Sequence, residues 1–333
     1  LAPRQALPGA AFLPPGRVRA ATVSDFGGFL KIACVSHCWL QADHPDPRGH
    51  NLSILGRVFR LMDTDGYVFY RGSWAVFLDF CCMHQDCRDR ESVPQQRTYK
   101  RLPNTDLFED GAVGKFKSEA VMFREALGGL GSLYSHPKTF VFMLTQLPAD
   151  YDDPAAYTRS GNVEQYLDRG WCFCELSLAM FAKSSYMLLD LGTSTGREDC
   201  YYSNRHKDEE ASLVRSCARA RKAPVLPDAF ASALEAKGFA HGEDDRPRVA
   251  ELYRAAFARR LSSAEVLRYD GLGWGDEEVQ QVAAVLASSA ASRLQILHLD
   301  GNRVGDGGAA RLAEALSTPG ALPALRLLRL ERQ

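Results

Sequence analysis

The stretch TFVFMLTQL, Thr139–Leu147, is a short and almost continuous apolar run, and three similar runs occur along the chain. They are FLKIACVSHCWL (29–40), WAVFLDFCC (74–82) and SSYMLLDLG (184–192). Segments with apolar residues at helical spacing separate them, at 51–62, 118–134 and 166–180. Short apolar runs that alternate with helices are typical of parallel strands covered on both faces. We therefore predict an α/β fold with a doubly wound parallel sheet.

Composition restricts the classes of partner and compartment. The 333 residues include 40 basic and 41 acidic side chains, which gives a net charge of −1. A balanced charge provides no field that would attract nucleic acid or an anionic membrane. No apolar run approaches the roughly 20 residues of a membrane-spanning helix. We expect a cytoplasmic protein with no nucleic-acid partner and no membrane contact, and we expect its nine cysteines to be free thiols.

The chain divides into four segments by pattern. Residues 1–27 are rich in Pro, Gly and Ala and are predicted to be a loosely ordered lead-in. The α/β domain is expected over 28–200, and residues 201–262 read as a helical connector or cap. Residues 263–333 form the repeated part described next.

Two segments near the end of the chain, 264–287 and 294–317, superpose at a spacing of 30 residues. Each has a short strand, a turn and an amphipathic helix, and a further strand begins in 325–333. The pattern LxxLxLxxN, from Leu294 to Asn302, resembles the leucine-rich repeat of the ribonuclease-inhibitor type. That resemblance implies a solenoid that binds a protein or another ligand. Because a repeat cannot bury its apolar face alone, we expect the array to continue beyond Gln333.

Polar side chains follow two of the predicted strands. Ser36, His37 and Trp39 end the first run, Asp79 lies within the second, and Gln85 follows it. Ligands of open α/β sheets bind outside the carboxyl ends of the strands, so these residues could line one pocket. Two alternatives stay open. His37 is either a general base or a structural side chain, and Asp79 either lines the pocket or caps a neighbouring loop.

Cysteine and histidine also occur together in CCMHQDC, residues 81–87. Its Cys81 and Cys82 are adjacent and would point to opposite faces of a strand, which does not suit the regular spacing of zinc ligands. We predict no metal site. A hydrolase working through His37 and either Cys38 or Cys82 has no nucleophile–base pair that spacing would identify.

The helical segment 166–180 contains WCFCEL, Trp171–Leu176, which resembles a signature of the Toll/interleukin-1 receptor (TIR) domain. The pair VFLDFCCMHQ and YLDRGWCFCEL is similar to the heterokaryon-incompatibility (HET) domain, a distant relative of TIR. Both resemblances cover roughly 29–192 and imply a flavodoxin-like parallel sheet. The order of these motifs, followed along the chain by the repeats, also resembles uncharacterised algal and protist proteins. The positions matching the HET pattern are Asp79, Cys82, Gln85, Arg169, Gly170, Trp171 and Glu175.

The TIR resemblance implies that Glu175 is the catalytic carboxylate of an NAD⁺ hydrolase, with NAD⁺ as substrate and no tightly bound cofactor. A carboxylate there would stabilise the oxocarbenium-like state of the ribose. His37 and Asp79 are further catalytic candidates, and an aromatic wall such as Trp39 or Trp171 could stack on the substrate. The alternative is that Glu175 forms a structural ion pair with Arg169 or another basic side chain and accepts backbone hydrogen bonds, so that it fixes the helix to the sheet. The candidate substrate-binding residues are Ser36, Trp39, Gln85, Arg169 and Trp171.

These patterns predict a sensor or adaptor of immune or self-recognition type. Its α/β domain would signal through self-association or NAD⁺ hydrolysis, and its repeats would bind a protein or another ligand. The alternative is a non-catalytic interaction scaffold. The sequence leaves open whether the α/β domain is catalytic, what the repeats bind and which oligomer forms.

Overall fold

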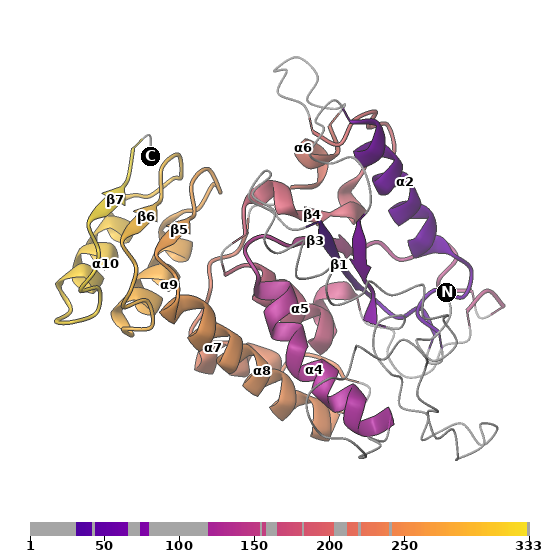
Figure 1. Ribbon diagram of the computed structural model, residues 1–333, viewed down its shortest axis with the longest axis horizontal. Coiled ribbons are helices and arrows are strands. Elements are labelled where there is room, and N and C mark those ends of the chain that lie inside the picture. Colours follow the sequence, from indigo (N-terminus) through magenta and orange to yellow (C-terminus); the bar gives the residue numbers. More distant parts are fainter. Residues whose placement is uncertain are drawn as a thin grey trace, which may run out of the picture.

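The fold is described from a computed structural model. It describes residues 31–41, 44–65, 74–79, 119–153, 155–157, 165–181, 183–202, 212–218, 221–239 and 242–331. The predicted lead-in 1–27 lies outside the described residues, as does the polar stretch 86–117 between two of the predicted elements. Figure 1 shows an α/β part and a smaller part of strands and helices, with long helices between them.

The described residues contain a parallel sheet of four strands, as the sequence predicted. They are β1 (Ile32–His37), β2 (Ala75–Phe77), β3 (Phe140–Leu144) and β4 (Leu188–Asp190). The order is β2-β1-β3-β4, and Cys34 of β1 pairs with Phe77 on one side and Val141 on the other. The chain therefore builds outward from β1 in both directions, so that the order reverses between β1 and β3. Such a switch point is where open α/β sheets bind ligands.

Strands β1, β3 and β4 are buried on both faces, which explains why they are continuously apolar, whereas Val76 of the edge strand β2 is exposed. Val35 and Phe142 belong to one apolar core with helices α2 (His50–Thr64) and α6 (Leu213–Cys217). Their neighbours Cys34 and Val141 belong to the other core, against α4 (Glu119–Ser135) and α5 (Gly170–Ala179). Figure 1 shows α2 and α5 on opposite sides of the sheet. The arrangement is compatible with a doubly wound α/β fold.

Helices α7 (Pro227–Leu234) and α8 (Gly242–Ser262) form an outer layer over α4 and α5. The rings of Phe230 and Tyr253 stack with centroids 3.8 Å apart. The ring of Phe239 lies so close to the start of α5 that position 170 requires glycine. A Cβ added there would lie 2.0 Å from that ring. The short helices of the α/β part are η5 (Tyr166–Asp168), η6 (Ser185–Met187) and η7 (Leu191–Thr193).

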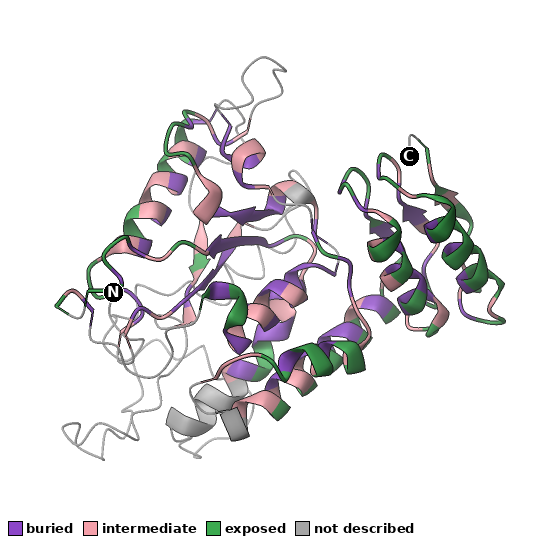
Figure 2. Cartoon of the chain, turned by 180° about the vertical axis from the view of Figure 1, so that it is seen from behind, coloured by how far each residue is buried: buried purple, intermediate pink, exposed green. Residues whose placement is uncertain are grey.

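The last described residues alternate strands and helices. Strands β5 (Val266–Arg268), β6 (Ile296–His298) and β7 (Leu327–Arg329) form a parallel sheet. Helices α9 (Asp276–Ala287) and α10 (Asp306–Ser317) connect them. Val266 pairs with Ile296, 30 residues further along, which is the period of the sequence, and Ile296 pairs with Leu327, 31 residues further along. Figure 2 shows buried residues on β5 and β6 and exposed residues on the outer sides of α9 and α10.

The side chain of Asn302 joins successive turns of this part. Its amide oxygen accepts hydrogen bonds from the backbone of Leu272 and Trp274, at 3.0 and 3.1 Å. Its nitrogen donates to the carbonyls of Tyr269 and Leu299, at 2.7 and 2.8 Å. A buried amide with four partners is fully satisfied, so it fixes the turn after each strand.

The two parts share one apolar core, which continues from the sheet across α5 and α8 to Tyr269 and Trp274. Tyr269 donates its hydroxyl proton to the carbonyl of Phe181 at 2.8 Å. The guanidinium of Arg221 lies over the Tyr269 ring, 5.2 Å from its centroid. Across the described part of the chain, none of the helices has the length and apolar character needed to cross a membrane.

Candidate functional site

Glu175 projects from α5 toward the carboxyl end of β1, where it joins a group of hydroxyls. Its Oε2 accepts a hydrogen bond from the Oγ of Ser36 at 2.5 Å. The same Oγ lies 2.5 Å from the hydroxyl of Tyr166 on η5. Tyr134 of α4 completes the group, and it donates its own proton to the carbonyl of Val35 at 2.9 Å. We call Ser36, Tyr134, Tyr166 and Glu175 the hydroxyl–carboxyl cluster.

The surroundings of Glu175 favour its neutral form. Burial raises the pKa of this carboxyl to about 8, although the hydrogen bond from Ser36 lowers it. The negative charge of Asp79 raises the pKa further, and a hydrogen bond with Tyr134 lowers it. The residue keeps an intermediate exposure, so solvent still reaches part of it. Burial therefore favours the neutral form of Glu175 to a higher pH than is usual for a glutamate.

Arg169 does not pair with Glu175, which is the ion pair that a structural role would have used. Its Nη1 donates to the carbonyl of Trp39 at 2.8 Å, and its Nη2 donates to the hydroxyl of Tyr151 at 3.3 Å. Arg169 is the N-cap residue of α5, six positions before Glu175, so the two side chains leave the helix in different directions. Among the described residues, no ion pair joins Glu175 to a basic side chain.

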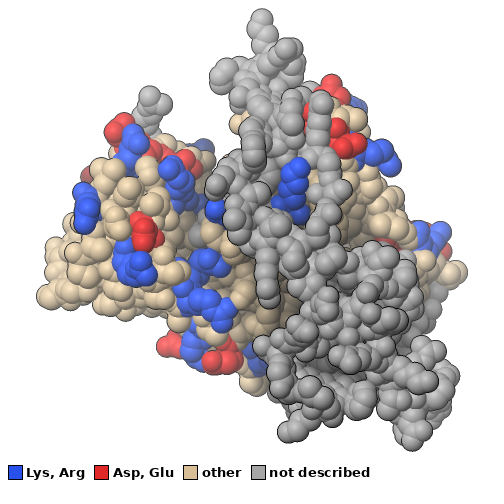
Figure 3. Space-filling view, in the orientation of Figure 1, with Lys and Arg blue, Asp and Glu red and all other residues tan. Residues whose placement is uncertain are grey.

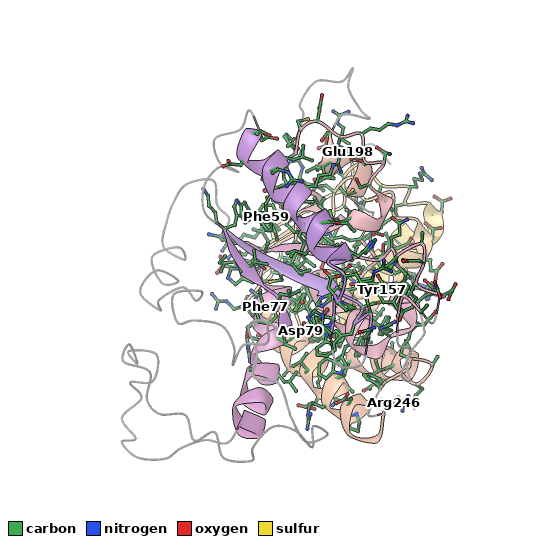
Figure 4. All side chains as sticks on the ribbon, turned by 90° about the vertical axis from the view of Figure 1, so that its right-hand side faces the viewer. Phe59, Phe77, Asp79, Tyr157, Glu198 and Arg246 are labelled. Atoms are coloured by element: carbon green, nitrogen blue, oxygen red, sulfur yellow. The ribbon has the colours of Figure 1, made fainter. Side chains whose placement is uncertain are left out.

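His37, Trp39 and Asp79 meet beside this cluster. The Nε2 of His37 lies 3.6 Å from Oδ1 of Asp79, and the indole of Trp39 donates to Oδ2 of Asp79 at 2.9 Å. Because side chains alternate along a strand, His37 lies on the α2 side of β1 and Ser36 on the α5 side. Asp79 connects the two sides, since it contacts His37 and its charge acts on Glu175. In Figure 4, Asp79 lies close to Phe77, the last residue of β2.

The remaining sequence candidates are Trp171, Gln85 and Cys82. Trp171 donates its indole proton to Asp245 of α8 at 3.1 Å, so its polar edge faces the outer helical layer. Gln85 and Cys82 lie outside the described residues, as does the rest of CCMHQDC. In the described ranges, no group of three or more His, Cys, Asp or Glu side chains is placed to hold a metal ion.

The thiols of Cys38 and Cys172 are hydrogen-bonded to each other at the start of α5. A hydrogen bond with Cys172 lowers the pKa of Cys38, and the same bond raises the pKa of Cys172. The sulfur of Cys172 lies 3.4 Å from the backbone carbonyl of His37 rather than from its ring. This geometry gives no thiol–imidazole pair of the kind that a thiol hydrolase uses.

Sequence reasoning missed Tyr134, Tyr166 and Cys172. Both tyrosines are buried. Tyr166 carried one usable signal, its position three residues before Arg169-Gly170-Trp171 in the stretch that suggested a site.

Comparison of the chain with protein-family models, with curated proteins and with solved structures gave no match.

Proposed function

We propose that the α/β part hydrolyses the N-glycosidic bond of a nucleotide through Glu175, and that the C-terminal repeats bind a protein or another ligand that controls this activity. NAD⁺ is the substrate that the TIR resemblance implies. The chain would then be an intracellular sensor of immune or self-recognition type. Its sheet would be the flavodoxin-like sheet of TIR and HET domains, and its repeats would begin a leucine-rich solenoid.

One observation carries the catalytic part of this proposal. Glu175 lies at the carboxyl end of β1, beside the point where strand order reverses, without a basic partner among the described residues. A carboxyl that only fixed a helix to a sheet would be expected to have a positive partner or several backbone donors. Its hydrogen bonds instead involve hydroxyl groups, and Asp79 lies close enough to raise its pKa. Strongly perturbed carboxyls of this kind are concentrated at functional sites.

The repeats support the binding part of the proposal. Val266 and Leu327 are exposed on the outer strands of the C-terminal sheet, at 42% and 45%. Arg268 and Arg329 follow them on the same face, two residues further along. Figure 3 shows basic and acidic side chains intermingled on the described part of the face in view, which matches a protein ligand better than a polyanion.

A second candidate function is a non-catalytic scaffold that signals by self-association. It is favoured by the internal hydrogen bonding of Glu175, since Ser36 already satisfies one carboxyl oxygen. In that case the cluster would only position α5 against β1.

The test is NAD⁺ consumption by the full chain at high protein concentration, with wild type beside Glu175→Gln. The matched control is Glu314→Gln, which makes the same chemical change at an exposed position of α10. Turnover that is lost in Glu175→Gln and retained in Glu314→Gln supports the hydrolase. An absence of turnover with NAD⁺ and with any other N-glycoside would leave the scaffold.

A further inference from the structure

Two loops follow the neighbouring strands β1 and β3 and pack against each other. They are residues 39–49 and 146–157, of which the structure describes all but 42, 43 and 154. Leu40 from the first loop and Tyr151 and Tyr157 from the second form a small apolar core, separate from the two cores that cover the sheet. The centroids of the two tyrosine rings lie 5.4 Å apart. We call these two segments the loop pair.

Charged side chains also join the two loops. The guanidinium of Arg48 forms an ion pair with Asp150 and lies over the ring of Tyr157, 5.7 Å from its centroid. Both partners of the ion pair are about half exposed, so salt screens the pair and it contributes little to stability. In the described residues, the backbone hydrogen bonds of each loop stay within that loop. The described contacts between the loops are therefore made by side chains.

Arg169 joins the loop pair to the helix that carries Glu175. It is the N-cap residue of α5, and its side chain is buried. Its Nη1 donates to the backbone carbonyl of Trp39 in the first loop, at 2.8 Å. Its Nη2 donates to the hydroxyl of Tyr151 in the second loop, at 3.3 Å. Because a guanidinium has donors on separate nitrogens in one rigid plane, this single side chain fixes both loops at a set distance from each other.

The loop pair lies where the sheet is expected to bind a ligand. Strand order reverses between β1 and β3, and the two loops follow the carboxyl ends of these strands. The first loop also reaches the surroundings of Glu175, because the indole of Trp39 donates to Asp79, whose charge acts on Glu175. A ligand that approaches Glu175 from the carboxyl ends of the strands would therefore meet the loop pair.

We propose that the loop pair is a lid over the candidate site, and that Arg169 is the positioning residue that holds this lid closed. A core of few residues opens at a lower free-energy cost than the main core of a domain, and lids are found in such parts of a fold. The sequence suggested Arg169 as a substrate-binding residue, and the geometry gives it a different role, because its described bonds go to the two loops. This inference rests on the proposed function only in placing the ligand at Glu175.

Hydrogen exchange of the full chain, followed by mass spectrometry, tests the lid without an assay of activity. In Arg169→Met, the hydrogen-bonded amides of both loops, such as those of Leu40 and Tyr151, should exchange faster by about 10-fold or more, because hydrogen bonds from a charged group are lost. Exchange in α2 should stay as in wild type. The matched control is Arg311→Met, which makes the same change at an exposed position of α10 and should leave both loops unchanged. Unchanged exchange in the loops of Arg169→Met, or faster exchange spread over the whole chain, would overturn the inference.

A second variant, Tyr151→Phe, removes the hydroxyl that Arg169 binds and keeps the ring in the small core. Alone, it should speed exchange in the second loop by less than Arg169→Met does. Added to Arg169→Met, it should have no further effect, because the hydrogen bond is already absent. Additive effects would overturn the inference. If Arg169→Met does not fold, Tyr151→Phe decides alone, and unchanged exchange in its second loop would be the contrary result.

The third measurement uses NAD⁺ as the probe and separates a lid from a purely structural tie. At about ten times its Kd, NAD⁺ should slow exchange in both loops of wild type about tenfold, since a ligand that binds only the closed form stabilises that form by this factor. In Arg169→Met this protection should be weaker. NAD⁺ turnover without protection of the loops would overturn the lid and leave the proposed function standing. Protection without turnover would support the lid and overturn the hydrolase, and an absence of both would overturn both.

Discussion

The replacement Glu175→Gln should change how the stability of the protein depends on pH. The amide is close in shape to the carboxyl but cannot ionise. Burial raises the pKa of Glu175 from 4.5 to about 8, so between these values the folded protein holds a proton that the unfolded chain has lost. Stability contributed by this proton is fully present below the unfolded pKa and is lost as pH rises through the folded one. Wild type should therefore lose stability relative to the variant across this window.

The size of the effect follows from the shift. Each unit of pKa corresponds to about 1.4 kcal/mol, so the shift sets an upper limit of about 5 kcal/mol. Glu175 keeps part of its surface exposed, and solvent screening reduces the expected change to about 2–3 kcal/mol. The difference between wild type and variant should fall steadily from about pH 5 and become level above pH 8.

Urea denaturation of the full chain, followed by circular dichroism at six pH values, measures this difference. Subtracting the variant cancels other titrating groups, such as Lys183, whose pKa burial lowers to about 7. Glu314→Gln serves as the control, and its difference from wild type should stay level. A level difference for Glu175→Gln between pH 5 and 8, with a change only below pH 4.5, would mean that Glu175 is ionised in the folded protein. That result would refute the reasoning.

Three further results are expected. NAD⁺ cleavage should rise as pH rises through about 8, because Glu175 stabilises the oxocarbenium-like state only when it is ionised, and a rate that stays level over this range would count against Glu175 as the catalytic carboxylate. Lys183→Met should lower the free energy of unfolding by roughly 2–4 kcal/mol in urea titrations. The reason is that the buried Lys183 ammonium donates to two carbonyls and to the hydroxyl of Thr139. An unchanged urea midpoint would contradict this prediction. Asn302→Ala should cost about 2–4 kcal/mol by the same measurement, since four backbone groups lose their partner, and a loss below about 0.5 kcal/mol would show that water replaces the amide.

The strands were predictable from the sequence because a strand that is buried on both faces forms a short continuous apolar run. Thr139–Leu147 contains β3, and each of the other three apolar runs contains one strand of the sheet. The order of the strands could not be predicted in this way, because it depends on pairs such as Cys34 and Val141 that are more than a hundred positions apart. The same limit applies to boundaries. Residues 213–217, assigned to a connector by pattern, pack as α6 on the sheet face that α2 also covers.

The candidate site was predictable as a location but not as a set of contacts. Ser36, Asp79 and Glu175 were found because polar residues inside or after apolar runs are conspicuous. Tyr134 and Tyr166 were not, since a tyrosine looks like any other aromatic until its hydroxyl partner is known. The partner of Tyr166 is Ser36, 130 positions away.

Helix α5 connects the site to the rest of the molecule, because Trp171 lies one turn before Glu175 on the same helix and makes a different contact. Glu175 faces β1 and bonds to Ser36, whereas Trp171 bonds to Asp245 in the outer helical layer. Just beyond the end of the helix, the carbonyl of Phe181 accepts the hydroxyl of Tyr269 from the C-terminal part. A shift of the repeats on binding a ligand would therefore act on the helix that carries the carboxyl, since packed helices move as units. The arrangement gives the proposed sensor a short physical route from its repeats to Glu175.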